Sequence, residues 1–284
     1  MKINYKLQNV ISVFIISALF LTISTSPVQA GSFWYTYLVQ EAQRFDAAGS
    51  DEARYAMISK PLNLTYLTGE ATKGTHPSEL DSKKLNHLGD GRLSVDEQDN
   101  VFGRKTNLLA LAISTGQLDF LRKFLKWVND INAPELLVSS EEQHSVNLAH
   151  ISVDFIYPYV STVTQEVRLQ IIDAIAVAGI DFNYVQPQGW HQHAPLIAPM
   201  VHGNYNDVKD RHVYQARILL HGADLKKNIK DDSGSFRPYV REGSELRKSL
   251  HDQYEDMHIK GDFISPSDDT MELIDDEREH RYSR

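Results

Sequence analysis

Residues 107–125 read NLLALAISTGQLDFLRKFL, and this stretch decides the fold class. Its first half places Leu109, Leu111 and Ala112 on the inner face of a short helix. Gly116 then allows a tight turn, because glycine adopts backbone angles that a Cβ disfavours. In the second half the apolar residues recur at i, i+3, i+6 and i+7, the spacing of a helix with one buried face: Leu118, Leu121, Phe124 and Leu125. The stretch therefore predicts two short helices joined by a glycine turn.

The same frame occurs three more times along the chain. A Pro-Leu opening with a glycine eight positions after the proline recurs at Pro61 and at Pro195, and a weaker copy begins near Ser145. The four units start at Pro61, Leu108, Ser145 and Pro195, which are 47, 37 and 50 residues apart. We therefore expect a helical repeat. Its units are lengthened by insertions at residues 70–77, 151–164 and 204–212.

This frame resembles the ankyrin repeat. The first helix of that family carries the pattern T-P-L-H-x-A-A-x-x-G, and its second helix ends in paired leucines before a G-A-D-V or D-V-N exit. The segments IAVAGIDFN at 175–183 and ARILLHGADL at 216–225 are similar to that ending. The resemblance implies an all-α, ankyrin-like helical solenoid with helical caps and about four degenerate repeats over residues 60–228. Each unit is longer than the family's period of about 33 residues.

The sequence departs from the family pattern in two ways. In this alignment the histidine of the first helix is replaced in every unit, by Asn63, Ala110, Asn147 and Ile197. We therefore expect the hydrogen-bond ladder of those histidines to be absent. Pro199 falls inside the first helix of the last unit, where a proline kinks or ends a helix.

The N-terminal 30 residues have the pattern of a signal peptide. Two lysines precede an apolar run at residues 10–25, and a Val-Gln-Ala motif precedes a cleavage point between Ala30 and Gly31. The alternative is an uncleaved membrane anchor, although the run is shorter than the roughly 20 residues of a spanning helix. We expect cleavage of residues 1–30 and a periplasmic or secreted mature chain. An exported chain without cysteine is typical of a bacterial protein.

Outside the repeats we expect caps and a tail. Residues 31–59 are predicted to form an N-terminal helical cap, because a terminal repeat has an apolar face to cover. Residues 229–260 hold a linker and a C-terminal amphipathic helix at 244–258. Residues 261–284 are polar and acidic, and this composition predicts a disordered tail.

Composition excludes several function classes. The 284 residues include 29 Lys and Arg against 38 Asp and Glu, a formal net charge of −9, which disfavours a surface for nucleic acid or anionic membranes. The chain has no cysteine, so disulfides, thiolate catalysis and cysteine-bound zinc are excluded. It has no G-x-S-x-G motif, no H-E-x-x-H motif and no glycine-rich phosphate loop. We predict no catalytic residues and no cofactor.

Residues 86–97 are similar to a calcium-binding loop. They have its central glycine and its final glutamate, but Leu88 stands where the third position needs an oxygen ligand. The competing interpretation is a hairpin between repeats, which residues 95–103 resemble. We favour the hairpin and leave open whether this segment binds an ion.

The histidines are the second possible metal ligands. His191 and His193 form the only close pair, and two ligands on one strand are too few for a zinc site. The others lack ligand spacing, and we interpret them as solvated or helix-terminal: His144, His150, His202, His212 and His221. We predict no metal site.

Binding surfaces are the remaining candidates. The resemblance implies a concave face made of hairpin tips and first helices, with tips at residues 98–102, 133–140 and 186–193. Trp190 and Phe102 are the anchors that we favour, since aromatic side chains dominate interface energetics. The alternative is that each ring packs locally. The predicted partner-contacting residues are Gln98, Asp99, Asn100, Phe102, Gln188, Trp190, His191 and His193.

We expect a protein-binding scaffold without catalysis. Its partner is a protein of unknown identity, with no nucleic acid and no membrane contact after signal cleavage. One alternative is an exported hydrolase or metal-dependent enzyme that uses histidines and carboxylates of the insertions. Another is a secreted effector that binds a host protein. The oligomeric state stays open.

Overall fold

The computed structural model describes residues 33–62, 107–139, 145–153, 163–185, 194–196, 208–225 and 244–283. Its helices are α2 (Phe33–Ala47), α3 (Asp51–Ser59), α6 (Leu108–Ser114), α7 (Leu118–Leu125), α8 (Leu148–Val153), α9 (Gln165–Val177), α11 (Val208–Leu220), α13 (Ser244–Lys260) and α14 (Asp268–Tyr282). A 3-10 turn, η3 (Pro134–Leu136), precedes a short antiparallel pair, β1 (Val138–Ser139) and β2 (Ser145–Val146). The predicted helical class is confirmed for the described part of the chain.

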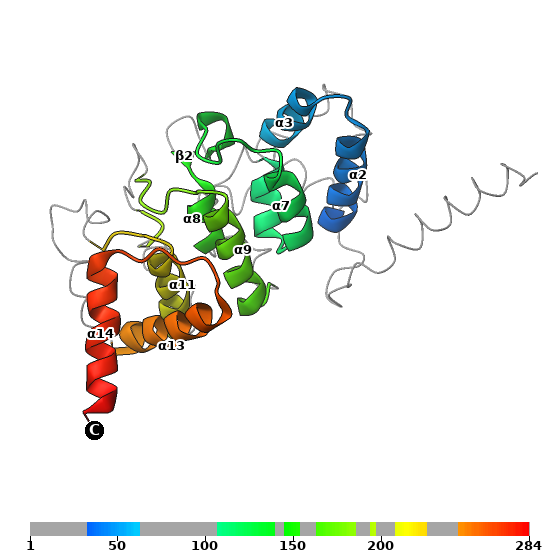
Figure 1. Cartoon of the computed structure of the whole chain (residues 1–284). Coiled ribbons are helices and arrows are strands. Elements are labelled where there is room, and N and C mark those ends of the chain that lie inside the picture. The colour runs from blue at the N-terminus through cyan, green and yellow to red at the C-terminus, as the bar shows by residue number, and fades with distance from the viewer. Residues whose placement is uncertain are drawn as a thin grey trace, which may run out of the picture.

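The helices follow one another in space as they do in the sequence. The pair α6 and α7 forms the predicted hairpin, and α8 packs on both α6 and α9 while α7 packs on α9. Further contacts join α9 to α11, α11 to α13 and α13 to α14. Figure 1 shows the result, with α2 and α3 at one end and α13 and α14 at the other. Neighbouring helices in the chain are therefore neighbours in the fold.

The start and end of α6 are fixed by two local devices. Asn107 caps the helix, since its Oδ1 accepts a hydrogen bond from the amide of Ala110 at 2.9 Å. Gly116 ends the turn with a φ of +69°. A Cβ at that position would lie 2.7 Å from a methyl group of Val163, so the turn requires glycine for space as well as for conformation.

Asn147 repeats the arrangement of Asn107 one unit later. Its Oδ1 accepts from the amide of His150 at 3.2 Å, and its Nδ2 donates to the carbonyl of Asp181 at 2.7 Å. The Nδ2 of Asn107 likewise donates to a carbonyl in a following loop, that of Leu136, at 2.9 Å. The two asparagines are thus equivalent and lie 40 residues apart.

This equivalence corrects the sequence alignment. Pairing Leu108 with Ser145 is wrong by three residues, because Ser145 belongs to strand β2 and the helix begins after the Asn147 cap. In the corrected register, His150 takes the place of Ala110. Its Nδ1 lies 2.8 Å from the Oδ1 of Asn147, so one first helix does carry a hydrogen-bonded histidine. The alignment that put Asn147 in place of this histidine is therefore wrong, while the expected absence of a ladder between units stays a prediction.

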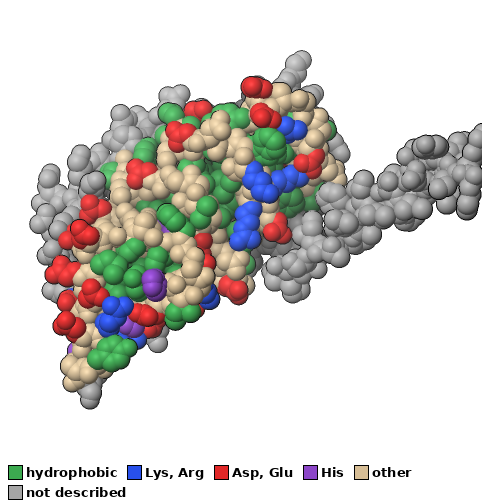
Figure 2. Space-filling model, viewed as in Figure 1, with side chains coloured by type: hydrophobic (Ala, Val, Ile, Leu, Met, Phe, Trp, Pro, Cys, Tyr) green, Lys and Arg blue, Asp and Glu red, His purple; other side chains and the backbone are tan. Residues whose placement is uncertain are grey.

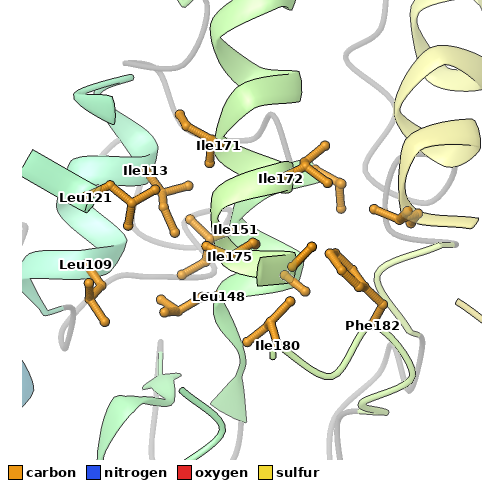
Figure 3. Packing of buried hydrophobic residues seen from close by; sticks show 14 of the residues in the cluster. Leu109, Ile113, Leu121, Leu148, Ile151, Ile171, Ile172, Ile175, Ile180 and Phe182 are labelled. Carbon is orange, nitrogen blue, oxygen red and sulfur yellow. The ribbon is translucent and has the colours of Figure 1, made fainter. Parts of the chain in front are cut away.

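One apolar cluster runs through the described helices. It extends from Tyr37 and Leu38 in α2 to Leu273 and Ile274 in α14. Figure 3 shows its centre, where side chains of the α6–α7 pair meet those of the α8–α9 pair and of the loop after α9: Leu109, Ile113, Leu121, Leu148, Ile151, Ile171, Ile172, Ile175, Ile180 and Phe182. The N-terminal cap joins it through Phe45, whose ring lies 5.4 Å from Phe124 and 6.0 Å from Trp127. Burial of these side chains is the main stabilising term of the fold.

The prediction of a disordered tail over 261–284 is wrong for most of that segment. Residues 268–282 form α14, which begins at a Ser267 cap whose Oγ accepts from the amide of Thr270 at 3.3 Å. Ile274 is 0% exposed. The acidic composition hid a narrow buried stripe, Thr270, Leu273, Ile274 and Glu277, which packs against the rest of the fold.

The predicted signal peptide at residues 1–30 lies outside the described residues, including its apolar run at 10–25. Among the described helices, none is both long and apolar enough to cross a membrane.

Candidate functional site

All of the predicted partner-contacting residues lie outside the described part of the chain: Gln98, Asp99, Asn100, Phe102, Gln188, Trp190, His191 and His193. The same holds for Ala30 and Gly31 and for residues 86–97. Of the three predicted tips, only the one at 133–140 is described, over residues 133–139. The structure does describe the loops from which two tips arise, and these loops are linked to one another.

The first link runs from Asn132 to the following unit. Its Nδ2 donates to the carbonyl of Gly179 at 2.9 Å, and its Oδ1 accepts from the amide of Asp181 at 2.8 Å. One side-chain amide therefore satisfies a carbonyl and an amide of the neighbouring loop together. Such two-point contacts fix the position of one loop relative to the next.

The second link has the same chemistry one unit later. The Nδ2 of Asn183 donates to the carbonyl of Gly222 at 3.2 Å, and its Oδ1 accepts from the amide of Asp224 at 2.7 Å. The backbone amide of each asparagine also donates to the carboxylate of the aspartate two residues earlier, at 2.9 Å for Asn132 and 2.8 Å for Asn183. We call these two contacts, centred on Asn132 and Asn183, the asparagine bridges. They hold three successive loops in one register.

The described tip is fastened to the N-terminal cap. The hydroxyl of Tyr55 in α3 donates to a carboxylate oxygen of Glu135 at 2.8 Å. Burial, followed by this bond to Glu135, raises the pKa of Tyr55 to about 12, so the phenol stays protonated and keeps donating at neutral pH. The tip at 133–139 is therefore held from both sides, by α3 and by the Asn132 bridge.

A second cluster lies where α9, α11 and the chain after α13 meet. The Nε2 of His221 lies 2.8 Å from the Oδ1 of Asp173, and the Nε of Arg217 lies 3.5 Å from the same oxygen. The imidazole is stacked between two rings, with centroids 6.2 Å away at Phe182 and 6.1 Å away at Phe263. We call these five residues the His221 cluster. It joins three segments that are far apart in the sequence, at residues 173–182, 217–221 and 263.

The segment that carries Phe263 is itself fastened to α11. Gly261 ends α13 with a φ of +73°, and the amide of Asp262 donates to the carbonyl of Met257 at 3.0 Å. The amide of Ser265 then donates to the carbonyl of Leu220 at 2.9 Å. At Gly222 a Cβ would lie 3.2 Å from the carbonyl oxygen of Ser265, which is why this close approach occurs at a glycine.

The contacts of the His221 cluster hold its imidazole in one position. The His221 side chain is 1% exposed, and its imidazole is stacked against the two phenyl rings. The carboxylate of Asp173 accepts from Nε2, which fixes the ring plane. The interpretation of His150 and His221 as solvated is therefore wrong, because both are buried, although His221 does directly follow the end of α11. No sequence signal could have paired His221 with Asp173, which is 48 residues away.

Figure 2 shows how charge is distributed on one face. Asp and Glu side chains gather at the C-terminal end, and Lys and Arg side chains gather nearer the N-terminal helices. Residues 244–283 contain 12 acidic and 5 basic residues, a formal charge of −7 out of −9 for the chain. Most of the net negative charge of the chain thus lies in α13, α14 and the segment between them.

Within the described residues, no group of three or more metal-ligating side chains is close enough to hold a metal ion. Comparisons of this chain with models of protein families, with curated proteins and with solved structures find no match.

Proposed function

We propose that this protein is an exported, ankyrin-like scaffold that binds another protein through its hairpin tips and the adjoining helices. In this proposal the described hairpins are consecutive repeats of a helical solenoid, and α2, α3, α13 and α14 cap its two ends. The binding residues are those of the tips at 98–102 and 186–193, with Phe102 and Trp190 as anchors. No catalysis is required.

The pair of asparagine bridges is the observation that carries the proposal. The side-chain amide of Asn132 makes two bonds to the next loop, and the side-chain amide of Asn183 makes the same two bonds one unit later. A contact that is repeated by translation along the chain is what a stack of similar units requires. It also holds the loops in place before any partner arrives, which lowers the entropy cost of binding.

The corrected register adds support. The cap at Asn147 followed by His150 matches the first and fourth positions of the T-P-L-H pattern in the resembled family. The bridge residues Asn132 and Asn183 occupy the last position of its D-V-N exit. Both matches come from hydrogen-bonded positions, which are harder to reproduce by chance than apolar spacing.

The proposal is tested by charging one predicted tip. The tagged full-length chain is crosslinked with formaldehyde in the cells that produce it, and the captured proteins are identified by mass spectrometry. We expect Trp190→Glu to abolish capture of a partner that the wild type enriches. Ile259→Glu serves as the control, since Ile259 is exposed on α13 and lies outside the tips. Unchanged capture by the Trp190→Glu protein, with an unchanged melting temperature, would contradict the role of this tip.

Export is a separate part of the proposal. Intact mass measured in cytosolic, periplasmic, membrane and medium fractions should find a soluble species that begins at Gly31. A membrane-bound species that retains residues 1–30 would make the scaffold a tethered one. Recovery of the partner from a host cell would instead favour the effector alternative.

The enzyme alternative gains no support from the described residues. The closest histidine–carboxylate pair among them, His221 with Asp173, is enclosed by Phe182 and Phe263 and holds a ring in place. Loss of turnover in a folded His191→Ala or His193→Ala protein would revive that alternative.

A further inference from the structure

The segment after α13 presents an aromatic side chain to solvent. Phe263 is 56% exposed, although its ring is stacked on the buried imidazole of His221. Exposed hydrophobic side chains are common singly and need no explanation. Phe263 differs from such residues because its ring is stacked on a buried imidazole and its segment is hydrogen-bonded to α11.

Two sets of contacts position this ring: those of His221, on which it is stacked, and those of the backbone on either side of it. The inner ring of the stack is Phe182, which is buried in the core, and His221 is held in plane by Asp173. The turn at Gly261 fixes where the segment leaves α13. The bond from the amide of Ser265 to the carbonyl of Leu220 fixes where it crosses α11. An exposed ring that is already ordered loses little entropy on binding, which is typical of an interface anchor.

A second exposed apolar residue, Val177, lies on the face of α9 that carries Asp173. Val177 is 72% exposed and follows Asp173 by four residues, so the two share one face of the helix. Asp173 on that face contacts His221, on which Phe263 is stacked. Asp173 and Phe263 are thus connected through two contacts, and Val177, one turn after Asp173, leaves apolar surface open as Phe263 does.

The chain segment that carries Phe263 is acidic, and the cation of the His221 cluster, Arg217, lies 3.5 Å from the carboxylate of Asp173. Residues 261–269 include Asp262, Asp268 and Asp269 and no basic residue. Lys260, immediately before them, is paired with Asp256 at 2.7 Å. A partner that covers Phe263 therefore meets carboxylates at its edge, and lysine or arginine there would complement them.

We propose that Phe263, with Val177, is a docking point for a protein segment that presents an apolar side chain flanked by lysine or arginine. The proposal rests on the protein-binding role proposed above and adds a second surface to it, at the C-terminal end of the array. Here the apolar side chain covers the open face of the Phe263 ring, and the basic residues pair with the carboxylates of the 261–269 segment.

A random dodecapeptide library displayed on phage tests this surface whatever the identity of the natural partner. The full-length protein is the bait, and enriched peptides are synthesised and titrated by fluorescence anisotropy. We expect enriched peptides to carry an apolar residue flanked by Lys or Arg. Their affinity should fall roughly tenfold or more for Phe263→Ala. It should also fall with added salt, because exposed charges are screened.

Two variants serve as controls. Tyr282→Ala removes another exposed aromatic from the acidic C-terminal helix, and it should leave the affinity unchanged. Phe263→Leu keeps an apolar side chain against His221, so it should retain the melting temperature and show an intermediate affinity. Equal binding of the selected peptides to Phe263→Ala and wild type overturns the proposal, as does a selection without basic residues.

The same panel separates this proposal from the scaffold role. Peptides that lose affinity for Trp190→Ala but not for Phe263→Ala would leave the scaffold function standing and remove this surface. Failure to select any peptide that depends on either residue would count against both.

Discussion

The middle of the molecule and its C-terminal end are held together by different forces. Within and between the α6–α7 and α8–α9 hairpins the contacts are apolar side chains and asparagine amides, most of them buried. Helices α13 and α14 share a buried stripe as well, but two exposed ion pairs flank it, Arg278 with Glu255 at 2.7 Å and Arg281 with Asp252 at 2.8 Å. Buried contacts persist across solvent conditions, whereas exposed ion pairs depend on pH and salt. The C-terminal end should therefore respond to conditions that leave the middle unchanged.

The largest expected effect comes from a matched pair of core isoleucines. Ile175 in α9 and Ile274 in α14 are both 0% exposed. Ile175→Ala should lower the free energy of unfolding by about 2–5 kcal/mol, because the cavity lies between two hairpins that cannot collapse around it. Ile274→Ala deletes the same atoms, yet we expect its main result to be detachment of α14 with the hairpins still folded.

Urea unfolding followed by hydrogen exchange of each helix separates the two outcomes. The Ile175→Ala protein should lose protection in α6 to α9 together, and the Ile274→Ala protein in α14 first. Val177→Ala on the exposed side of α9 is the control and should change stability by less than about 0.5 kcal/mol. Simultaneous loss of protection everywhere in the Ile274→Ala protein would show that the two regions are one cooperative unit.

A smaller effect is expected at two asparagines of these hairpins: Asn147 bonds within its own unit, and Asn132 bonds to the next one. Asn147 is 2% exposed, and Asn147→Ala removes both a helix cap and the bond to the carbonyl of Asp181. The expected cost is about 1–3 kcal/mol, since the Asp181 carbonyl loses its side-chain donor. Asn132→Ala also removes two bonds, but water reaches this exposed site, so about 0.5–1.5 kcal/mol is expected. Thermal unfolding of both variants measures the ranking, and a larger loss at Asn132 would contradict it.

Sequence reasoning predicted the helical segments at 31–59, 107–125 and 244–258, but it missed the last helix, α14. Periodic apolar residues and Gly116 were enough to predict the hairpin of α6 and α7, because local spacing determines both helices. The register of the next unit needed Asn147, and sequence spacing alone could not tell its capping role from that of nearby polar residues. The bridges at Asn132 and Asn183 fall in the loop ending that the pattern had identified, but their partners lie 47 to 49 and 39 to 41 residues away.

The segment that forms α14 was mispredicted for a physical reason. Composition weighs all residues of α14 equally, whereas folding depends on the few that are buried, and Leu273 and Ile274 are enough to dock the helix. The His221 cluster was missed for a different reason. It gathers side chains from three segments, and no local pattern encodes contacts such as that of Phe263 with His221.

The smallest expected effect is a pH-dependent loosening of the contact between α13 and α14. The hydrogen bond from Arg278 holds the pKa of Glu255 below its ordinary value of 4.5. A carboxyl group whose pKa is lowered by folding contributes its stabilisation fully above the ordinary pKa and loses it as the pH falls through the lowered one. Below pH 4.5 the bond to Arg278 should therefore weaken progressively, while the apolar hairpins keep their structure.

Backbone NMR spectra recorded between about pH 7 and pH 3 measure this change helix by helix. Amide shifts in α14 should move at acidic pH before those in α6 to α9, and Arg278→Ala should remove much of the early step because the pair is then already broken. Added salt at neutral pH should shift the same α14 amides in the same direction, since it screens exposed pairs. If the amides of α9 and α14 moved together in both titrations, the ion pairs would not distinguish the two regions, and the buried stripe around Ile274 would account for the docking of α14.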